Sequence, residues 1–157
     1  MRHLRLFAPA TPALVLLATA IVWSTDHDVG VNAIEVGGRA EVALTQSLEG
    51  ALSTIYGVAE KEIPLCLFGT RNEDETLLKR AAFPDQLSTT DSTVTFDGTS
   101  CEARPDFLGY VHNHDPPGSL CEPTPLDKVR FALNSDSKVE LIACTWETEV
   151  TYHAFGL

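Results

Sequence analysis

Basic residues are scarce in this chain. Among its 157 residues, 11 are Lys or Arg and 22 are Asp or Glu, so that the formal net charge at pH 7 is −11. An acidic surface repels phosphate backbones and anionic lipid headgroups. We therefore expect no nucleic-acid partner. Acidity alone selects no other partner, because it also keeps ordinary proteins soluble.

Internal repeats and dense cysteines are missing as well. No period of about 20 to 50 residues recurs, which excludes a repeat solenoid. The four cysteines are too few for a small scaffold held together by disulfides. The hydrophobic fraction of 44% argues against a disordered chain. The length allows one domain with a core of its own, but not two.

Charged residues are absent from Leu6 to Thr25, and this stretch follows a basic head in residues 1–5. A basic head followed by an apolar stretch is typical of an export signal. We therefore interpret residues 1–25 as a signal peptide or a transmembrane anchor, and residues 26–34 as a linker.

Two forms of export signal remain open. Ala18-Thr19-Ala20 matches a cleavage site, and cleavage of residues 1–20 would make the mature protein secreted or periplasmic. The uncharged run 6–25 is also long enough to cross a bilayer, which would leave the protein anchored and facing outward. Pro9 and Pro12 weaken that helix only near its start. Both forms place the rest of the chain outside the cytoplasm, and a buried core helix is the remaining alternative.

Hydrophobic spacing in residues 35–157 predicts one α+β domain with a mixed sheet and two principal helices. Apolar residues recur at helical spacing over 39–59, which indicates an amphipathic helix. Thr124 is the expected N-cap of a second helix, with Pro125 in its first turn and its end near Asn134. Strands are expected at 63–68, 77–83, 93–96, 107–111, 139–146 and 149–155, of which the last two would form a hairpin.

The segment His112-Asn113-His114 follows the expected strand 107–111. Side chains at i and i+2 of a strand point to the same face, so His112 and His114 can aim their imidazoles at one point. Asp127, in the first turn of the following helix, is a suitable third ligand. Hydrolytic zinc sites commonly use three protein ligands and a water, whose pKa falls to about 7. We therefore predict a Zn²⁺ site on His112, His114 and Asp127.

Each of these features has a commoner interpretation when it is taken alone. An H-x-H tripeptide in a strand is usually ordinary surface or core histidine, and Thr-Pro-x-Asp is usually a helix start. Glu62, at the head of the apolar run 63–68, is by itself a solvated charge at a strand end. What favours a site is the order of the features along the chain.

Taken together, these residues resemble the JAB/MPN (JAMM) metalloprotease family. The pattern of that family is a glutamate followed by L-x-G, then H-x-H, then S-x-x-D. The matching positions here are Glu62 with Leu67 and Gly69, His112 with His114, and Thr124 with Asp127, and the resemblance covers about residues 35–157.

The resemblance implies a JAB/MPN-like fold of the cytidine-deaminase-like type, in which three layers place a mixed sheet between two principal helices. It also implies zinc-dependent hydrolysis of peptide or isopeptide bonds in a protein or peptide substrate. Glu62 would take a proton from the zinc-bound water. The Thr124 hydroxyl would help to stabilise the oxyanion of the tetrahedral intermediate.

Some positions depart from the family pattern. Asp115 stands where proline usually follows H-x-H, although Pro116 comes next. Thr124 replaces serine but keeps the hydroxyl, and Pro64 and Leu65 replace small residues. The interval between H-x-H and the acidic ligand is longer than the commonest form. None of these changes removes a ligand, but they leave the substrate subsite open.

Two other kinds of site are excluded. Nucleases named for an H-N-H motif spread its residues over a ββα unit, whereas here the letters form a tripeptide. Zinc deaminases need H-x-E and a later P-C-x-x-C, and the chain has neither.

The cysteines have several pairings open to them. Cys101 and Cys121 lie in polar segments on either side of the H-x-H strand, and an exported chain permits disulfides. We therefore predict a Cys101–Cys121 bridge, with Cys66 and Cys144 either reduced core residues or paired with each other. The alternative makes Cys121 a fourth zinc ligand, which would close the site and abolish hydrolysis.

The predicted function is thus that of an exported, zinc-dependent peptidase or isopeptidase of JAB/MPN type. A non-catalytic MPN-like scaffold and an exported metal-binding protein without turnover are the alternatives. Scaffold members of the family usually lack one or more ligands, whereas this chain has all three. The pattern specifies neither the substrate nor the oligomeric state.

Overall fold

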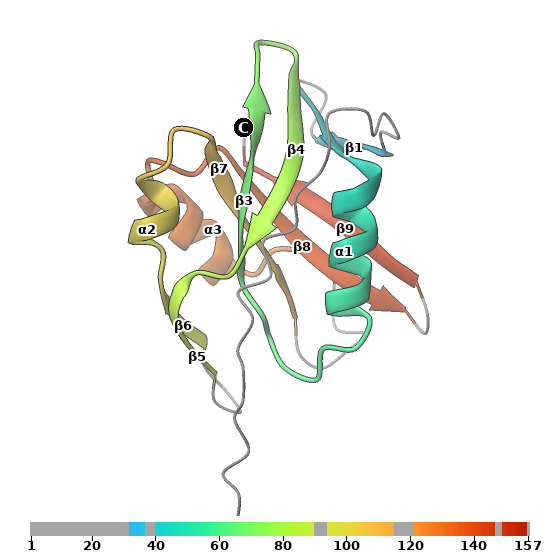
Figure 1. Ribbon diagram of the computed structural model, residues 1–157, viewed down its shortest axis with the longest axis vertical. Helices are drawn as coiled ribbons and strands as arrows, with labels where there is room; N and C mark the ends of the chain where they lie inside the picture. The colour runs from blue at the N-terminus through green and yellow to red at the C-terminus, as the bar shows by residue number, and fades with distance from the viewer. Residues whose placement is uncertain (1–31, 37–39, 90–93, 115–120, 147–148, 157) are drawn as a thin grey trace, which may run out of the picture.

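The computed structural model describes residues 32–36, 40–89, 94–114, 121–146 and 149–156, and strands dominate these parts of the chain (Figure 1). The strands are β1 (Asn32–Val36), β2 (Ala40–Leu44), β3 (Leu65–Arg71), β4 (Glu75–Ala82), β5 (Asp85–Thr89), β6 (Val94–Asp97), β7 (Phe107–Asn113), β8 (Val139–Trp146) and β9 (Glu149–Phe155). The helices are α1 (Gln46–Tyr56), α2 (Thr99–Glu102) and α3 (Pro125–Leu133).

Seven of these strands form one sheet, in the order β1-β2-β4-β3-β7-β8-β9. The pairs β2–β4 and β7–β8 are parallel, and the other neighbours are antiparallel. The sheet curls so strongly that its end strands, β1 and β9, contact each other, which makes it nearly closed, like a barrel. Strands β5 and β6 form a separate two-stranded ribbon.

One face of the curled sheet packs against α1. Leu48, Leu52 and Tyr56 lie on one side of this helix and are buried. They share a core cluster with side chains of the sheet, among them Leu44 of β2 and Val111 of β7. Burying a side chain of this size contributes roughly 1.5–3 kcal/mol. The helix is therefore fixed against the middle of the sheet.

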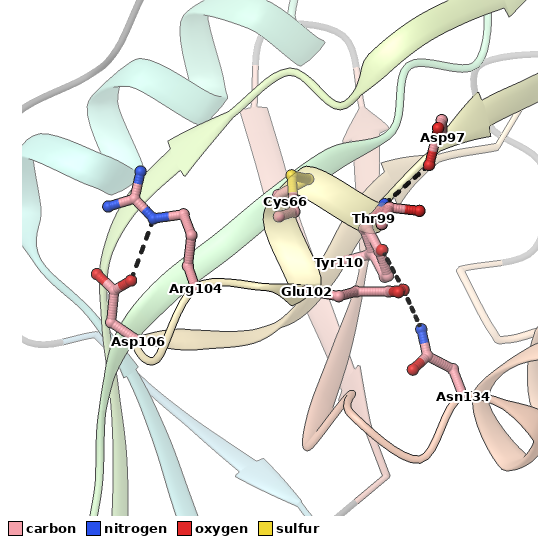
Figure 2. The surroundings of a disulfide bond; sticks show 9 residues. Cys66, Asp97, Thr99, Glu102, Arg104, Asp106, Tyr110 and Asn134 are labelled. Atoms are coloured by element: carbon pink, nitrogen blue, oxygen red, sulfur yellow. Dashed lines mark hydrogen bonds and ion pairs between the residues drawn. A yellow bond between two sulfur atoms is a disulfide. The ribbon is translucent and has the colours of Figure 1, made fainter.

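The opposite face of β3 and β7 carries a smaller cluster beside α2. Its members are Cys66, Phe68, Cys101, Phe107 and Tyr110. A disulfide between Cys66 and Cys101 ties α2 to β3 (Figure 2).

A β-bulge in β7 determines which of its side chains lie on the face that packs beside α2. Phe107 and Tyr110 share the face although strict alternation would separate residues three apart. The pairing with β3 steps from Phe107 to Gly109 and leaves Leu108 as an extra residue. One extra residue shifts the alternation of everything that follows it.

The predicted three-layer α+β arrangement is wrong. The described parts of the chain are mostly strand, and the sheet nearly closes on itself instead of lying open between two principal helices. One reason is that residues 40–44, which were expected to open the first helix, form β2. Val42 and Leu44 alternate into the core, and β2 pairs with both β1 and β4. Strands β1 and β2, which were not predicted, extend the sheet far enough for it to curl back on β9.

Several elements lie where the sequence predicts them. The helical spacing in 39–59 corresponds to α1 from Gln46 onward. Helix α3 follows the predicted N-cap Thr124 and ends at Leu133, with Asn134 as its C-cap. The last two strands form the predicted antiparallel hairpin, with the predicted bounds.

The predicted export segment, residues 1–25, lies outside the described residues, as does most of the predicted linker. The end of that linker, residues 32–34, belongs to β1. Among the helices in the described parts of the chain, none combines the length and the apolarity that crossing a bilayer requires.

The predicted Cys101–Cys121 disulfide is wrong. The structure pairs Cys66 with Cys101 and Cys121 with Cys144. Although both predicted partners flank β7 in the sequence, Cys101 lies in α2 against β3, whereas Cys121 precedes α3 and is joined to β8. Because Cys121 forms a disulfide, it is not a fourth metal ligand in this structure.

Candidate metal centre

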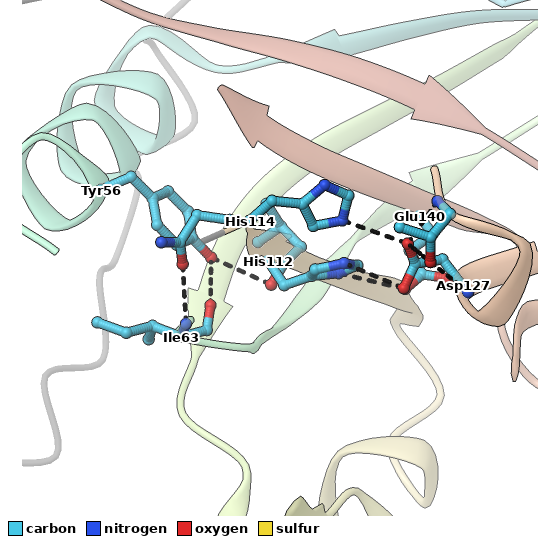
Figure 3. A network of polar contacts seen from close by, with 9 residues as sticks. Tyr56, Ile63, His112, His114, Asp127 and Glu140 are labelled. Carbon is cyan, nitrogen blue, oxygen red and sulfur yellow. Dashed lines mark hydrogen bonds and ion pairs between the residues drawn. The ribbon is translucent and has the colours of Figure 1, made fainter. Parts of the chain in front are cut away.

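Strand β7 presents the two predicted histidine ligands on one face of the sheet. It lies between β3 and β8, and its residues are buried along its whole length. After the bulge, Val111 points to the core on the α1 side. The alternation therefore directs His112, and His114 just past the end of the strand, to the opposite side, where α3 lies (Figure 3).

The third predicted ligand, Asp127, is held by the first turn of α3. The Oγ1 atom of the N-cap Thr124 accepts a hydrogen bond from the Asp127 N–H at 3.2 Å, while the Thr124 N–H donates to Asp127 Oδ2 at 2.7 Å. The Thr124 hydroxyl also donates to Oδ2, at 2.6 Å. This reciprocal capping box fixes the carboxylate against the end of the helix. The hydroxyl is thus engaged with Asp127, and its contribution to an oxyanion stays a prediction.

The three side chains converge on one point (Figure 3). Their ligand atoms all lie within 4.8 Å of one another. His114 Nε2 is 3.2 Å from Asp127 Oδ2, and His112 Nε2 is 3.5 Å from Asp127 Oδ1, so each carboxylate oxygen faces one ring. Ligand atoms about 2.0–2.1 Å from a tetrahedral zinc ion are about 3.4 Å apart. The group His112, His114 and Asp127 could therefore hold a metal ion.

Among the residues that the structure describes, one buried nitrogen of the group finds no hydrogen-bond partner. This atom is His112 Nε2, whose 3.5 Å contact with Asp127 is too long for a hydrogen bond of ordinary strength. Leaving a buried polar atom unpaired costs about 1–3 kcal/mol. A cation between the three side chains would give this nitrogen a partner, so the unpaired atom and the donor set both fit a bound metal.

Sequence analysis missed a further residue of the site, Glu140 of β8. Its Oε1 atom lies 3.4 Å from His112 Nδ1, whereas the other ring nitrogen, Nε2, is the one near Asp127 (Figure 3). A carboxylate on the outer nitrogen of a metal-binding imidazole fixes the tautomer and the orientation of the ring. The signal in the sequence was a charged residue inside the otherwise apolar run 139–144.

The electrostatics of the group favour a positive charge at its centre. Burial lowers the pKa of His112, but the negative charges of the Asp127 and Glu140 carboxylates beside the ring raise it to about 9. Burial raises the pKa of Asp127, but the neighbouring His112 ring and the hydrogen bonds from Thr124 hold it well below its usual range. The carboxylate is thus ionised and the imidazole attracts a cation, which can be a proton or a metal ion.

The structure brings the predicted general base, Glu62, to the same place. Glu62, His112 and Asp127 line one cavity. Because β3 begins at Leu65, Glu62 lies in the segment between α1 and β3 and not at the head of a strand. Its position therefore depends on the contacts of that segment with the rest of the protein.

The cavity has a volume of about 400 Å³, and Phe96, Tyr110 and Phe131 form part of its wall. Glu102 also lines it and accepts hydrogen bonds from Tyr110 Oη at 2.7 Å and from Asn134 Nδ2 at 2.8 Å (Figure 2). Cavities of about 300–1,000 Å³ with aromatic walls and a few placed polar groups are typical of small-ligand sites. This one has room for side chains of a substrate next to the metal group.

In comparisons with known proteins, no family model matches the chain, and no curated protein matches its sequence. What this protein does is therefore inferred from the residues of the site and their geometry.

Proposed function

We propose that this protein is a zinc-dependent hydrolase that cleaves peptide or isopeptide bonds. The observation that carries the proposal is the convergence of His112, His114 and Asp127 on one point beside a cavity that Glu62 also lines. A metal group with an open position, a general base and a space for substrate are the parts from which metal-assisted hydrolysis is commonly built.

The donor set favours zinc among the common metals. Magnesium and calcium take six or more ligands, nearly all of them oxygen, whereas two imidazoles and one carboxylate are typical of catalytic zinc. Three protein ligands leave the fourth position open, and the Cys121–Cys144 disulfide keeps Cys121 from filling it. When bound, zinc polarises a carbonyl and lowers the pKa of water to about 7.

Each group of the site then has a separate role in hydrolysis. Glu62 accepts the proton of the attacking water as the water oxygen bonds to the carbonyl carbon, and passes this proton to the amine when the C–N bond breaks. Thr124 keeps Asp127 in place through the capping box. The aromatic wall of the cavity holds an apolar part of the substrate and limits the access of water.

The order of the site residues supports a peptide or isopeptide bond as the target. Glu62, His112-x-His114 and Thr124-x-x-Asp127 resemble the pattern of the JAB/MPN metalloproteases, which act on such bonds. The support comes from the site alone, because the three-layer fold that the resemblance implied is not the fold of this chain.

We also propose that the protein works outside the cytoplasm, as a secreted, periplasmic or membrane-anchored enzyme. The basic head and the uncharged run in residues 1–25 support export. The two disulfides fit an oxidising compartment. The expected substrate is therefore a protein or peptide of that compartment.

The test compares purified wild-type protein with Glu62→Gln and Glu60→Gln. Zinc is measured by elemental analysis, and hydrolysis is measured on a peptide library by mass spectrometry. Wild type should bind one zinc and cleave peptides. Glu62→Gln should keep the zinc but lose about 10²–10⁴ in rate, because the general base is gone. Glu60 is exposed in the same segment, so Glu60→Gln should behave like wild type.

Each failure has a separate meaning. Zinc without turnover would identify a metal-binding protein, and absence of both would favour a non-catalytic scaffold. Hydrolysis by Glu62→Gln at the rate of wild type would show that the mechanism is wrong, whatever the metal content.

A further inference from the structure

We infer that Asn113, the residue between the two histidines, is a positioning residue that holds Glu62 at the metal group. The inference rests on the proposed function, because it gives Glu62 its role as the base. It gives the His112-Asn113-His114 segment a second task besides supplying the two candidate histidine ligands.

The side chain of Asn113 grips the backbone on both sides of Glu62. Its Oδ1 atom accepts a hydrogen bond from the Ile63 N–H at 2.8 Å, and its Nδ2 atom donates to the Lys61 carbonyl oxygen at 3.1 Å. Asn113 is only 6% exposed, so these bonds are shielded from competing water. The two backbone neighbours of Glu62 are thus both hydrogen-bonded to the side-chain amide of Asn113.

The placement of Asn113 in β7 makes this grip specific. Strand alternation turns its side chain away from the face of His112 and His114, toward the segment that follows α1. One strand therefore presents the ligands on one face and holds the base-bearing segment with the other. Any shift of β7 moves the ligands and the base together.

Only an amide of this length makes both bonds. The Ile63 N–H can only donate and the Lys61 carbonyl can only accept, which also fixes the orientation of the amide. Aspartate would lose the donor, and alanine or leucine would lose both groups. Tyr56 gives the segment a second attachment, because its hydroxyl lies 3.1 Å from the carbonyl oxygens of both Ile63 and Val111 (Figure 3). That attachment reaches Ile63 only, so it does not bracket Glu62.

Glu62 needs a fixed position because proton transfer requires a particular geometry. A general base has to lie within hydrogen-bond reach of the proton that it removes. Because Glu62 is outside regular secondary structure, its backbone depends on such contacts for its position. A misplacement of about 1 Å at a catalytic site can cost about 10² in rate.

The test is a double-mutant cycle on the zinc-loaded full-length protein, with Asn113→Ala, Glu62→Gln and the combined variant. Asn113→Ala should lower kcat by about 10–100-fold with little change in KM or in zinc content. The combined variant should be no slower than Glu62→Gln alone, because Asn113 acts only through Glu62. A residue with a purely structural role would instead slow the Glu62→Gln protein further.

A second measurement needs no substrate. Hydrogen exchange at the Ile63 amide should accelerate by about fivefold or more in Asn113→Ala, because the N–H loses its acceptor. If wild type binds zinc but cleaves no peptide, the proposed function fails while this measurement still decides whether Asn113 holds the segment.

Two further variants keep the test decisive. Asn72→Ala removes an asparagine whose Oδ1 accepts two backbone N–H groups in the turn between β3 and β4, and it should leave kcat unchanged. If Asn113→Ala does not fold, Asn113→Asp replaces it, since aspartate keeps the acceptor for Ile63 and loses only the donor to Lys61. A wild-type kcat in the folded variant, or loss of zinc from it, would overturn the inference.

Discussion

The imidazole of His112 contacts two carboxylates. Asp127 faces one ring nitrogen, and Glu140 lies 3.4 Å from the other. Both acidic residues are largely buried, and both stabilise positive charge on the ring. We therefore expect Glu140 to raise the affinity for a metal without touching it, by holding the ring in the orientation that presents Nε2 to the candidate site.

Glu140→Gln should weaken zinc binding by about 10–100-fold, the usual effect of losing such a partner. Glutamine has nearly the same size, so the fold should persist while the charge and the strong acceptor are lost. The dissociation constant is measured by competition with a chromophoric chelator. Glu149→Gln, on the exposed side of β9, is the matched control. Equal zinc affinity in both variants would show that Glu140 does not support the ligand.

Among the elements, β7 and β8 leave no room for a side chain at Gly109. This residue has φ +153°, and a Cβ atom there would overlap the carbonyl oxygen of Val139. Only glycine fits a backbone of this conformation at such close approach. The parallel pairing of β7 and β8 begins at this pair and continues through His112 to Asn113. The glycine thus protects the geometry of the strand that bears the ligands.

Gly109→Ala should lower the free energy of unfolding by about 3 kcal/mol, at the upper end of the usual range for single substitutions. The measurement is urea unfolding followed by circular dichroism. Gly50→Ala offers a contrast, because Gly50 lies inside α1 and an added Cβ meets open space. That variant should gain roughly 0.5–1 kcal/mol from helix propensity. A Gly109→Ala protein as stable as wild type would contradict the argument from close approach.

Local patterns predicted the elements whose causes are local. Thr124 and Pro125 predict the start of α3, because an N-cap and a first-turn proline influence only the first turn of the helix. Strand β2 was missed because residues 40–44 continue a helical spacing, and only pairing with β1 and β4 makes them a strand. The two candidate histidine ligands were predicted from alternation within β7, and Asp127 from its place in the first turn of the following helix. Glu140 was missed because its contact with His112 depends on the pairing of β8 with β7, which the sequence of either strand does not contain.

For the whole molecule, two disulfides connect elements that are distant in sequence. Cys66–Cys101 joins β3 to α2, and Cys121–Cys144 joins the segment before α3 to β8. The second bond anchors the segment that leads directly into the capping box of Asp127, whereas the first lies in the cluster around Phe107 and Tyr110. The two bonds should therefore differ in what they do for the metal site.

Peptide mapping without reduction should find these two pairs, and a Cys101–Cys121 peptide would contradict the structure. Replacing Cys121 and Cys144 together by serine should cost about 3 kcal/mol of stability and also weaken zinc binding, because Asp127 loses support. Replacing Cys66 and Cys101 together should cost a similar amount of stability. That second variant should leave the zinc affinity unchanged, and equal losses of affinity in both would show that neither bond is specific to the site.

The extra residue in β7 has a consequence for transplanting the site. Counting along an even ladder from Phe107 would assign the histidines to the α1 side and the asparagine to the metal side. Because Leu108 is an extra residue, the histidines point instead to the metal side and the asparagine to the α1 side. The orientation of the tripeptide therefore depends on the bulge that precedes it. A graft of His112-Asn113-His114 onto another strand would therefore have to include the segment from Phe107. On a strand without a bulge, the tripeptide would have to be shifted by one residue so that the histidines point to the intended face.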